Sequence, residues 1–191
     1  MARSTLARVA LIYPEAAPED VDAVRALIGR VPRTAFEVVV RSLSGAPVVI
    51  RNAPLERDGT PMPTRFWLVG PVQIAAIGHI EAAGGVRRAE SEVAADEVAA
   101  AHVRYGAERD ACLPPDWDGP VPSGGVGGTR QGVKCLHAHY AWYLAGGDDP
   151  IGRWTQSQLD PAGTLGLRSS ASLRCSPGLT TPYGRDPAGT P

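Results

Sequence analysis

Three short runs of β-branched and aromatic residues lie between residues 36 and 69, and they constrain the fold more than any other feature. The runs cover residues 36–41, 48–50 and 65–69, and turn residues such as Ser44-Gly45 separate them. Short runs of this composition, joined by turns, predict a small antiparallel sheet. Because apolar residues with helical spacing dominate the later residues, the predicted fold class is α+β: a three-stranded sheet with a helical C-terminal half.

Proline, glycine and acidic residues mark the ends of the predicted helices. Proline fits the first helical turn, acidic side chains suit the positive end of the helix dipole, and glycine commonly follows the last turn. On this basis, helices are expected over residues 18–28, 71–83, about 91 or 94 to 112, and about 131 or 133 to 144, with one short helical turn at 151–154.

The chain of 191 residues is long enough for one domain with a substantial core. We expect a loose leader over residues 1–17, a single α+β domain over 18–160, and a disordered tail over 161–191. The tail is expected to be disordered because more than half of it is proline, glycine, serine or threonine. A segment of that composition buries too little apolar surface to offset its loss of conformational entropy.

The charge balance argues against two classes of partner. The net charge is −1, so no overall field attracts nucleic acid or an anionic membrane surface. No stretch approaches the roughly 20 apolar residues that a membrane-spanning helix needs. The first residues lack a long apolar segment typical of a signal peptide. We therefore expect a cytoplasmic protein that binds neither nucleic acid nor membrane.

A glycine-rich run that leads into a predicted helix is the strongest candidate for a binding site. Glycine frees the backbone, so successive N–H groups can converge on an anion, and the N-terminus of a helix favours an anion for the same reason. The pattern is not a P-loop, since no Gly-Lys-Ser/Thr is present. A flexible linker is the simpler interpretation. The residues expected to bind a phosphate-type anion are Gly124, Gly125, Gly127, Gly128, Arg130 and Lys134.

Cys135, His137 and His139 follow this run. If they belong to one regular helix, Cys135 and His139 share a side, whereas His137 lies about 160° away among the apolar residues. We therefore expect His137 in the core, and we expect no metal site and no cofactor. A metal would need ligands from distant parts of the chain, namely His79, His102 or Cys112.

Cys135 also suggests an enzyme. A cysteine near a helix N-terminus and beside Lys134 has features that lower a thiol pKa, and His139 or His137 would assist it. A thiol-dependent enzyme using Cys135 with one of these histidines is therefore the alternative to a binding protein. A buried cysteine that acts only as a small apolar side chain is the plainer interpretation. A purely structural partner protein is a second alternative, and whether the protein is an enzyme stays open.

Three stretches carry a resemblance to a known family: NAPLERDGTPMPTRFWLVGP, HIEAAGGVRR and GGVGGTRQGVKCLHAHYAWYLAGGDDPIG. Over about residues 20–160 the chain resembles the bacterial, mainly actinobacterial, domain of unknown function 501 family. The resemblance implies a small cytoplasmic protein with a link to cell division. It also implies cysteines at residues 41–45 and before Pro71, which this chain lacks. The expected function is a non-catalytic protein that binds an anionic small molecule or regulates a cell-division partner.

Overall fold

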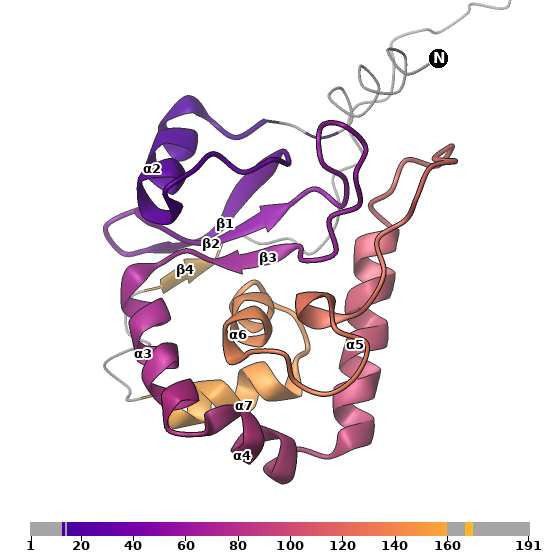
Figure 1. Ribbon diagram of the computed structural model, residues 1–191. Helices are drawn as coiled ribbons and strands as arrows, with labels where there is room; N and C mark the ends of the chain where they lie inside the picture. Colours follow the sequence, from indigo (N-terminus) through magenta and orange to yellow (C-terminus); the bar gives the residue numbers. More distant parts are fainter. Residues whose placement is uncertain (1–12, 14, 160–166, 170–191) are drawn as a thin grey trace, which may run out of the picture.

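The sheet is antiparallel and has four strands in the order β3-β2-β1-β4 (Figure 1). A computed structural model describes residues 13, 15–159 and 167–169 of the chain. The strands are β1 (Phe36–Ser42), β2 (Pro47–Asn52), β3 (Phe66–Leu68) and β4 (Leu167–Ser169). The predicted α+β class, the antiparallel sheet and the first three strands are confirmed.

The predicted number of strands is wrong, because β4 pairs with the outer edge of β1. Edge strands present unpaired backbone groups to which a further segment can bond, whatever its own pattern. Leu167–Ser169 lies within the expected tail, whose remaining residues, 161–166 and 170–191, lie outside the described residues, as does residue 160. Of the expected leader, residues 1–12 and 14 also lie outside them, whereas Glu15 forms an ion pair with Arg57 at 2.7 Å.

Six α-helices occupy the described residues, together with one short 3-10 helix. They are α2 (Pro18–Ile28), α3 (Pro71–Ala82), α4 (Gly85–Glu92), α5 (Ala95–Asp110), η1 (Val126–Gly128), α6 (Leu136–Leu144) and α7 (Pro150–Gln158). Among the described residues, no helix is both long and apolar enough to cross a membrane.

The predicted starts of α2 and α3, at Pro18 and Pro71, are confirmed. Three other helices differ from expectation. The sequence does not predict α4. This helix begins directly after Gly84, a residue in the left-handed conformation with a φ of 80°. α7 is longer than the one predicted turn, and the carboxylate of Asp149 caps its start by accepting the N–H of Gly152. α6 begins at Leu136, later than predicted, because Cys135 is still extended.

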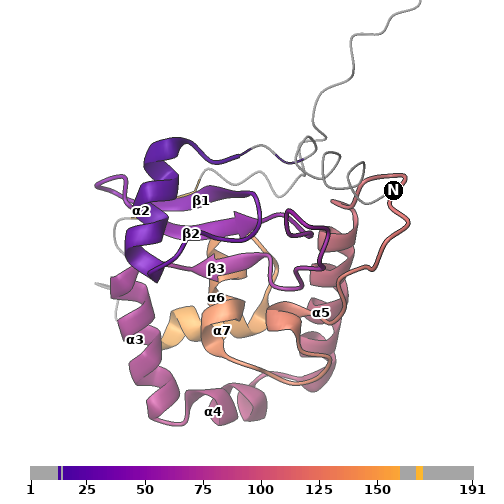
Figure 2. The same cartoon turned by 45° about the horizontal axis from the view of Figure 1, so that its top comes forward.

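The sheet separates two unequal layers of helices. Figure 1 and Figure 2 show α2 on one face and the other helices beyond the opposite face, with α6 surrounded by α3, α5 and α7. On the first face, Val24 of α2 packs with Val38 and Ile50. On the other face, the sheet packs against α5 and α6, and Trp142 belongs to this cluster.

The central position of α6 explains why it has no single apolar stripe. One side contributes Trp142, whose ring lies 5.1 Å from that of Tyr105 on α5. The other side faces α7 so closely that a Cβ at Gly152 would lie 2.3 Å from the Cβ of Tyr143. A helix that is covered all round buries residues on every side. His139 is therefore fully buried. A prediction that assumes one apolar stripe on α6 is wrong about which of its side chains are buried.

Candidate functional site

The glycine-rich loop has a conformation that requires glycine at several positions. Gly124, Gly127 and Gly128 have φ angles of 78°, 66° and 76°, in the left-handed region that other residues rarely adopt. Gly125 has a different reason, because a Cβ there would lie 2.4 Å from the side chain of His102. The glycines thus serve the backbone turn and its close approach to α5.

Several N–H groups of this loop donate to acceptors within the protein. Gly125 N donates to Thr129 O at 2.7 Å, and Gly128 N donates to Gly125 O at 2.9 Å. Val126 N donates to Nδ1 of His102 at 3.0 Å. That bond places the ring hydrogen of His102 on Nε2, which donates to Gly132 O at 2.9 Å. His102 therefore connects two parts of the loop and is itself fully hydrogen-bonded.

Two carboxylates occupy the backbone donors that the sequence assigned to an anion. Oε1 of Glu81 accepts the N–H of Leu136 at 2.6 Å, and Oε1 of Glu90 accepts the N–H of Val133 at 2.9 Å. The ammonium group of Lys134 donates to the carbonyl of Gly127 at 3.0 Å. The N-terminus of α6 is thus stabilised by a carboxylate of the protein itself, which suits the helix dipole.

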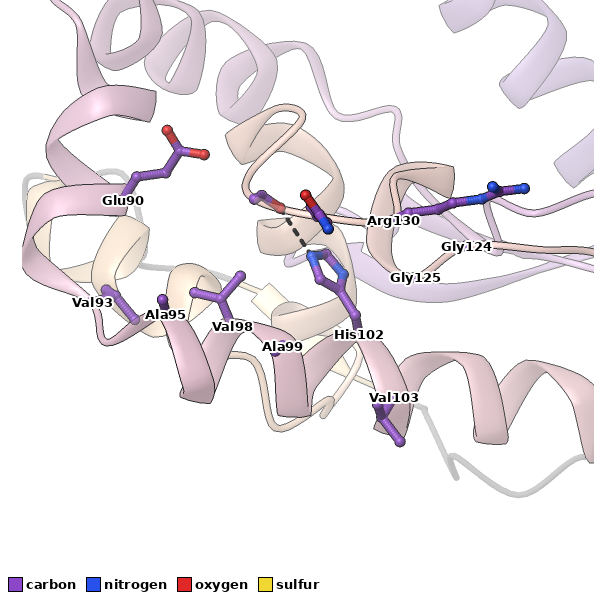
Figure 3. A pocket seen from close by; sticks show the side chains of 12 residues that line it. Glu90, Val93, Ala95, Val98, Ala99, His102, Val103, Gly124, Gly125 and Arg130 are labelled. Carbon is purple, nitrogen blue, oxygen red and sulfur yellow. Dashed lines mark hydrogen bonds between the residues drawn. The ribbon is translucent and has the colours of Figure 1, made fainter.

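A pocket of about 600 Å³ lies between α5 and the glycine-rich loop (Figure 3). α5 contributes one face of the pocket at helical spacing: Ala95, Val98, Ala99, His102 and Val103. In Figure 3, Glu90 and Arg130 lie on opposite sides of His102. Of the residues expected to bind an anion, only Gly124, Gly125 and Arg130 line the pocket. Arg130 is exposed, and it has no hydrogen bond or ion pair with any described residue.

A second polar cluster lies where α3 meets the start of α6. Cys135 is extended, with φ −161° and ψ 149°, so a helical wheel does not apply to it. Nδ1 of His137 lies 3.1 Å from Oε1 of Glu81, and its Nε2 lies 3.2 Å from the carbonyl oxygen of Ile74. The ligand atoms of Glu81, Cys135 and His137 all lie within 4.8 Å of one another. The prediction that His137 lies in the core is wrong, because its side chain is 28% exposed.

The environment of Cys135 does not favour a thiolate. Burial raises the pKa of the thiol, and the charge of Glu81 adds to the rise. Lys134 and the N–H groups of His137 and Ala138 lower this pKa, but by less than burial raises it. Whether Cys135 is buried depends on the fold, so the sequence alone indicated only the effects that lower the pKa of its thiol.

His139 is fully buried at the contact between α6 and α7. Its Nδ1 lies 2.7 Å from Oδ2 of Asp149, which is also fully buried, and Oδ1 of Asp149 accepts the N–H of Gly152 at 2.9 Å. Asp149 therefore joins the histidine to the first turn of α7. Cys135 lies beside His137 in the polar cluster, whereas the ring nitrogen Nδ1 of His139 is bonded to Asp149.

Sequence reasoning missed the partners that organise both regions. Glu81 and His102 lie 55 and 24 residues away from the backbone groups that they bind, and no local pattern identifies such contacts. Asp149 did have a local signal, because an aspartate before a proline is typical of a helix start.

These features define a small α+β protein with a central helix, a pocket beside a glycine-rich loop and a polar cluster at the start of the central helix. The model of the family described as "Protein of unknown function (DUF501)" matches residues 38–157, which is more than half of the chain. The chain therefore belongs to this family, and the resemblance is confirmed. The match runs from β1 to α7, and α2 lies outside it. No curated protein and no solved structure matches the chain.

Proposed function

We propose that this protein is a non-catalytic binding protein whose pocket between α5 and the glycine-rich loop takes an anionic small molecule with an apolar part. The observation that carries the proposal is Arg130, a residue that lines the pocket and whose guanidinium has no hydrogen bond or ion pair with any described residue. Guanidinium groups bind carboxylate and phosphate through paired hydrogen bonds.

The remaining walls support a ligand with an apolar part. Pockets that hold small molecules commonly measure about 300–1,000 Å³ and combine apolar walls with a few polar groups. Val98, Ala99 and Val103 supply apolar surface on α5. His102 has both ring nitrogens bonded, so it holds the loop wall in place and leaves recognition of the anion to Arg130.

The other candidate functions have less support. A thiol-dependent enzyme would need an activated Cys135, and burial raises the pKa of this thiol. A cell-division partner is a proposal that rests on the family resemblance alone, since no contact or surface described above selects such a protein.

The test measures thermal stability and binding heat for the full chain with four probes: inorganic phosphate, polyphosphate, a nucleotide and an alkyl phosphate. A ligand that binds only the folded state stabilises it by about 2.7 kcal/mol at 100 times its dissociation constant. We expect the alkyl phosphate to give the largest rise in Tm, because it satisfies Arg130 and covers the apolar wall. Arg130→Gln should weaken its binding about tenfold or more, since a charged hydrogen bond contributes about 1.5–3 kcal/mol.

Two further variants make the result specific to the pocket. Ala99→Phe places a ring in the pocket and should weaken binding without removing a charge. Arg87→Gln changes an exposed arginine of α4 that does not line the pocket, and binding should stay as in the wild type. The proposal fails if no probe raises Tm, or if Arg130→Gln and Ala99→Phe bind the alkyl phosphate as tightly as the wild type.

A further inference from the structure

We infer that Glu81, Cys135 and His137 form a binding site for a single Zn²⁺ ion at the junction of α3 and α6. Their ligand atoms come from three different local structures: the last turn of α3, an extended residue and the first turn of α6. All three atoms nevertheless lie within 4.8 Å of one another. The site shares no residue with the pocket beside α5, so this inference is independent of the proposed function.

His137 provides the strongest argument. Both ring nitrogens of His137 face oxygen atoms that accept hydrogen bonds: Nε2 lies 3.2 Å from the carbonyl oxygen of Ile74, and Nδ1 lies 3.1 Å from Oε1 of Glu81. A neutral imidazole has one N–H, so it can donate to only one of these oxygens. When Nε2 donates to Ile74, the lone pair of Nδ1 points at the carboxylate, and a metal ion between the two atoms is bound by both.

The surrounding bonds are those that a metal site needs. A histidine ligand commonly donates its other ring N–H to a carbonyl or carboxylate, which fixes the orientation of the ring. His137 has this arrangement through Ile74. Glu81 is oriented in a similar way by the N–H of Leu136, which holds Oε1 at 2.6 Å. Both potential ligands are thus held in place by backbone groups that take no part in coordination.

The type of ligand points to zinc. Zn²⁺ accepts sulfur, nitrogen and oxygen ligands together, with bonds of about 2.0–2.3 Å, whereas Mg²⁺ and Ca²⁺ prefer oxygen alone. Tetrahedral bonds of this length place ligand atoms about 3.3–3.8 Å apart, so small side-chain rotations bring the three atoms into range. The side chains of Glu81 and His137 are 25% and 28% exposed, which leaves room for a fourth ligand from solvent.

The test uses the full chain after chelation of bound metal. Titration with ZnCl₂, followed by calorimetry, should show one equivalent of binding, and Zn²⁺ should raise Tm. Replacement of Zn²⁺ by Co²⁺ should give a thiolate-to-metal charge-transfer absorption. Cys135→Ser should remove that absorption. Cys135→Ser, His137→Gln and Glu81→Gln should each weaken Zn²⁺ binding by more than the about 10- to 100-fold that follows loss of an outer-shell partner.

The controls distinguish loss of the site from loss of the fold. Serine is a better N-cap than cysteine, so metal-free Cys135→Ser should have a Tm equal to or above that of the metal-free wild type. His79→Gln changes an exposed histidine of α3 outside the cluster, and its affinity should equal that of the wild type. A wild-type chain that takes up no stoichiometric Zn²⁺ would show that His137 and Glu81 hold no metal. Equal affinity in all three cluster variants would place the metal elsewhere. Either result overturns the inference.

Discussion

At the scale of single residues, three histidines near α6 show how completely the partner decides the role of a side chain. His102 joins two parts of the glycine-rich loop, His139 bonds to a buried aspartate, and His137 faces Glu81 at the surface. Their neighbours in the sequence do not distinguish these roles. The helical wheel predicted that His137 lies in the core, whereas the structure buries His139 fully and leaves His137 partly exposed.

Glu108 gives a prediction about pH. Burial raises the pKa of its carboxyl, although Trp142 donates to it at 2.9 Å and Arg65 lies nearby. A carboxyl with a higher pKa in the folded state binds more protons there than in the unfolded state. Its contribution to the free energy of unfolding is therefore most favourable at low pH and is lost as pH rises through the folded-state pKa. In Glu108→Gln this loss should be absent, and the acceptor for Trp142 remains.

The measurement is urea unfolding of the wild type and Glu108→Gln at several values between about pH 4 and pH 8, a range that starts near the ordinary pKa of a glutamate and extends above it. The free energy of unfolding of the wild type should fall relative to that of the variant as pH increases. A constant difference across the range would mean that burial does not perturb this carboxyl.

At the scale of elements, the approach of the glycine-rich loop to α5 depends on one missing methyl group. Gly125 has a φ of −97°, outside the left-handed region, and the side chain of His102, Cβ and ring together, leaves no space for a Cβ at this position. Gly125→Ala should lower the free energy of unfolding by about 1–3 kcal/mol, the usual cost of overpacking. Gly78→Ala is the matched control: nothing lies within 4 Å of its added Cβ, and alanine in α3 should stabilise by about 0.5–1 kcal/mol.

Chemical unfolding of both variants checks the sign of each change. The cause is checked by repeating Gly125→Ala in a His102→Gly chain, where the cost should shrink because both the ring and the Cβ of His102 are gone. If the two substitutions destabilise the protein independently, the proposed clash between residue 125 and the side chain of His102 is incorrect.

At the scale of the whole molecule, β4 completes the sheet from a segment distant in the sequence. Leu167 pairs with Ser42 and Ser169 pairs with Val40, so this short strand covers an edge of β1. A chain ending at residue 160 should be less stable than one ending at residue 169 by about 1–3 kcal/mol, because a few backbone hydrogen bonds are lost.

Thermal unfolding and hydrogen exchange of the two truncated chains test this contribution. The backbone amides of β1 near Val40 should exchange faster in the shorter chain, while those of β2, paired with β3 on its other side, should change less. Identical Tm values and identical exchange in β1 would show that β4 contributes nothing to the sheet.

The predictable part of the fold lies where local signals act alone. The strands at 36–41, 48–50 and 65–69 were predictable because β-branched and aromatic residues stand between turn residues. α2 and α3 begin at prolines, which restrict the backbone whatever lies around them. α4 was not predicted because it has only 8 residues and few of them are apolar. The start of α6 was misplaced because Cys135 continues the preceding extended segment.

For the candidate site, the sequence identified the glycine-rich loop and the cysteine and histidine residues after it, but not how they combine. Half of the expected anion-binding set, Gly124, Gly125 and Arg130, lines the pocket, whereas Lys134 bonds to Gly127. Glu81 joins Cys135 and His137 only because α3 packs beside the start of α6 (Figure 1).

The sequence by itself determined the α+β class, the antiparallel pairing of the first strands, the starts of two helices and membership of the family. These depend on backbone preferences and on patterns within a few residues. Only the tertiary structure decided the fourth strand, the central position of α6 and the side chains that surround Cys135, His137 and His139. Those depend on contacts between residues far apart in the chain, and such contacts form only when the helices and the sheet pack together.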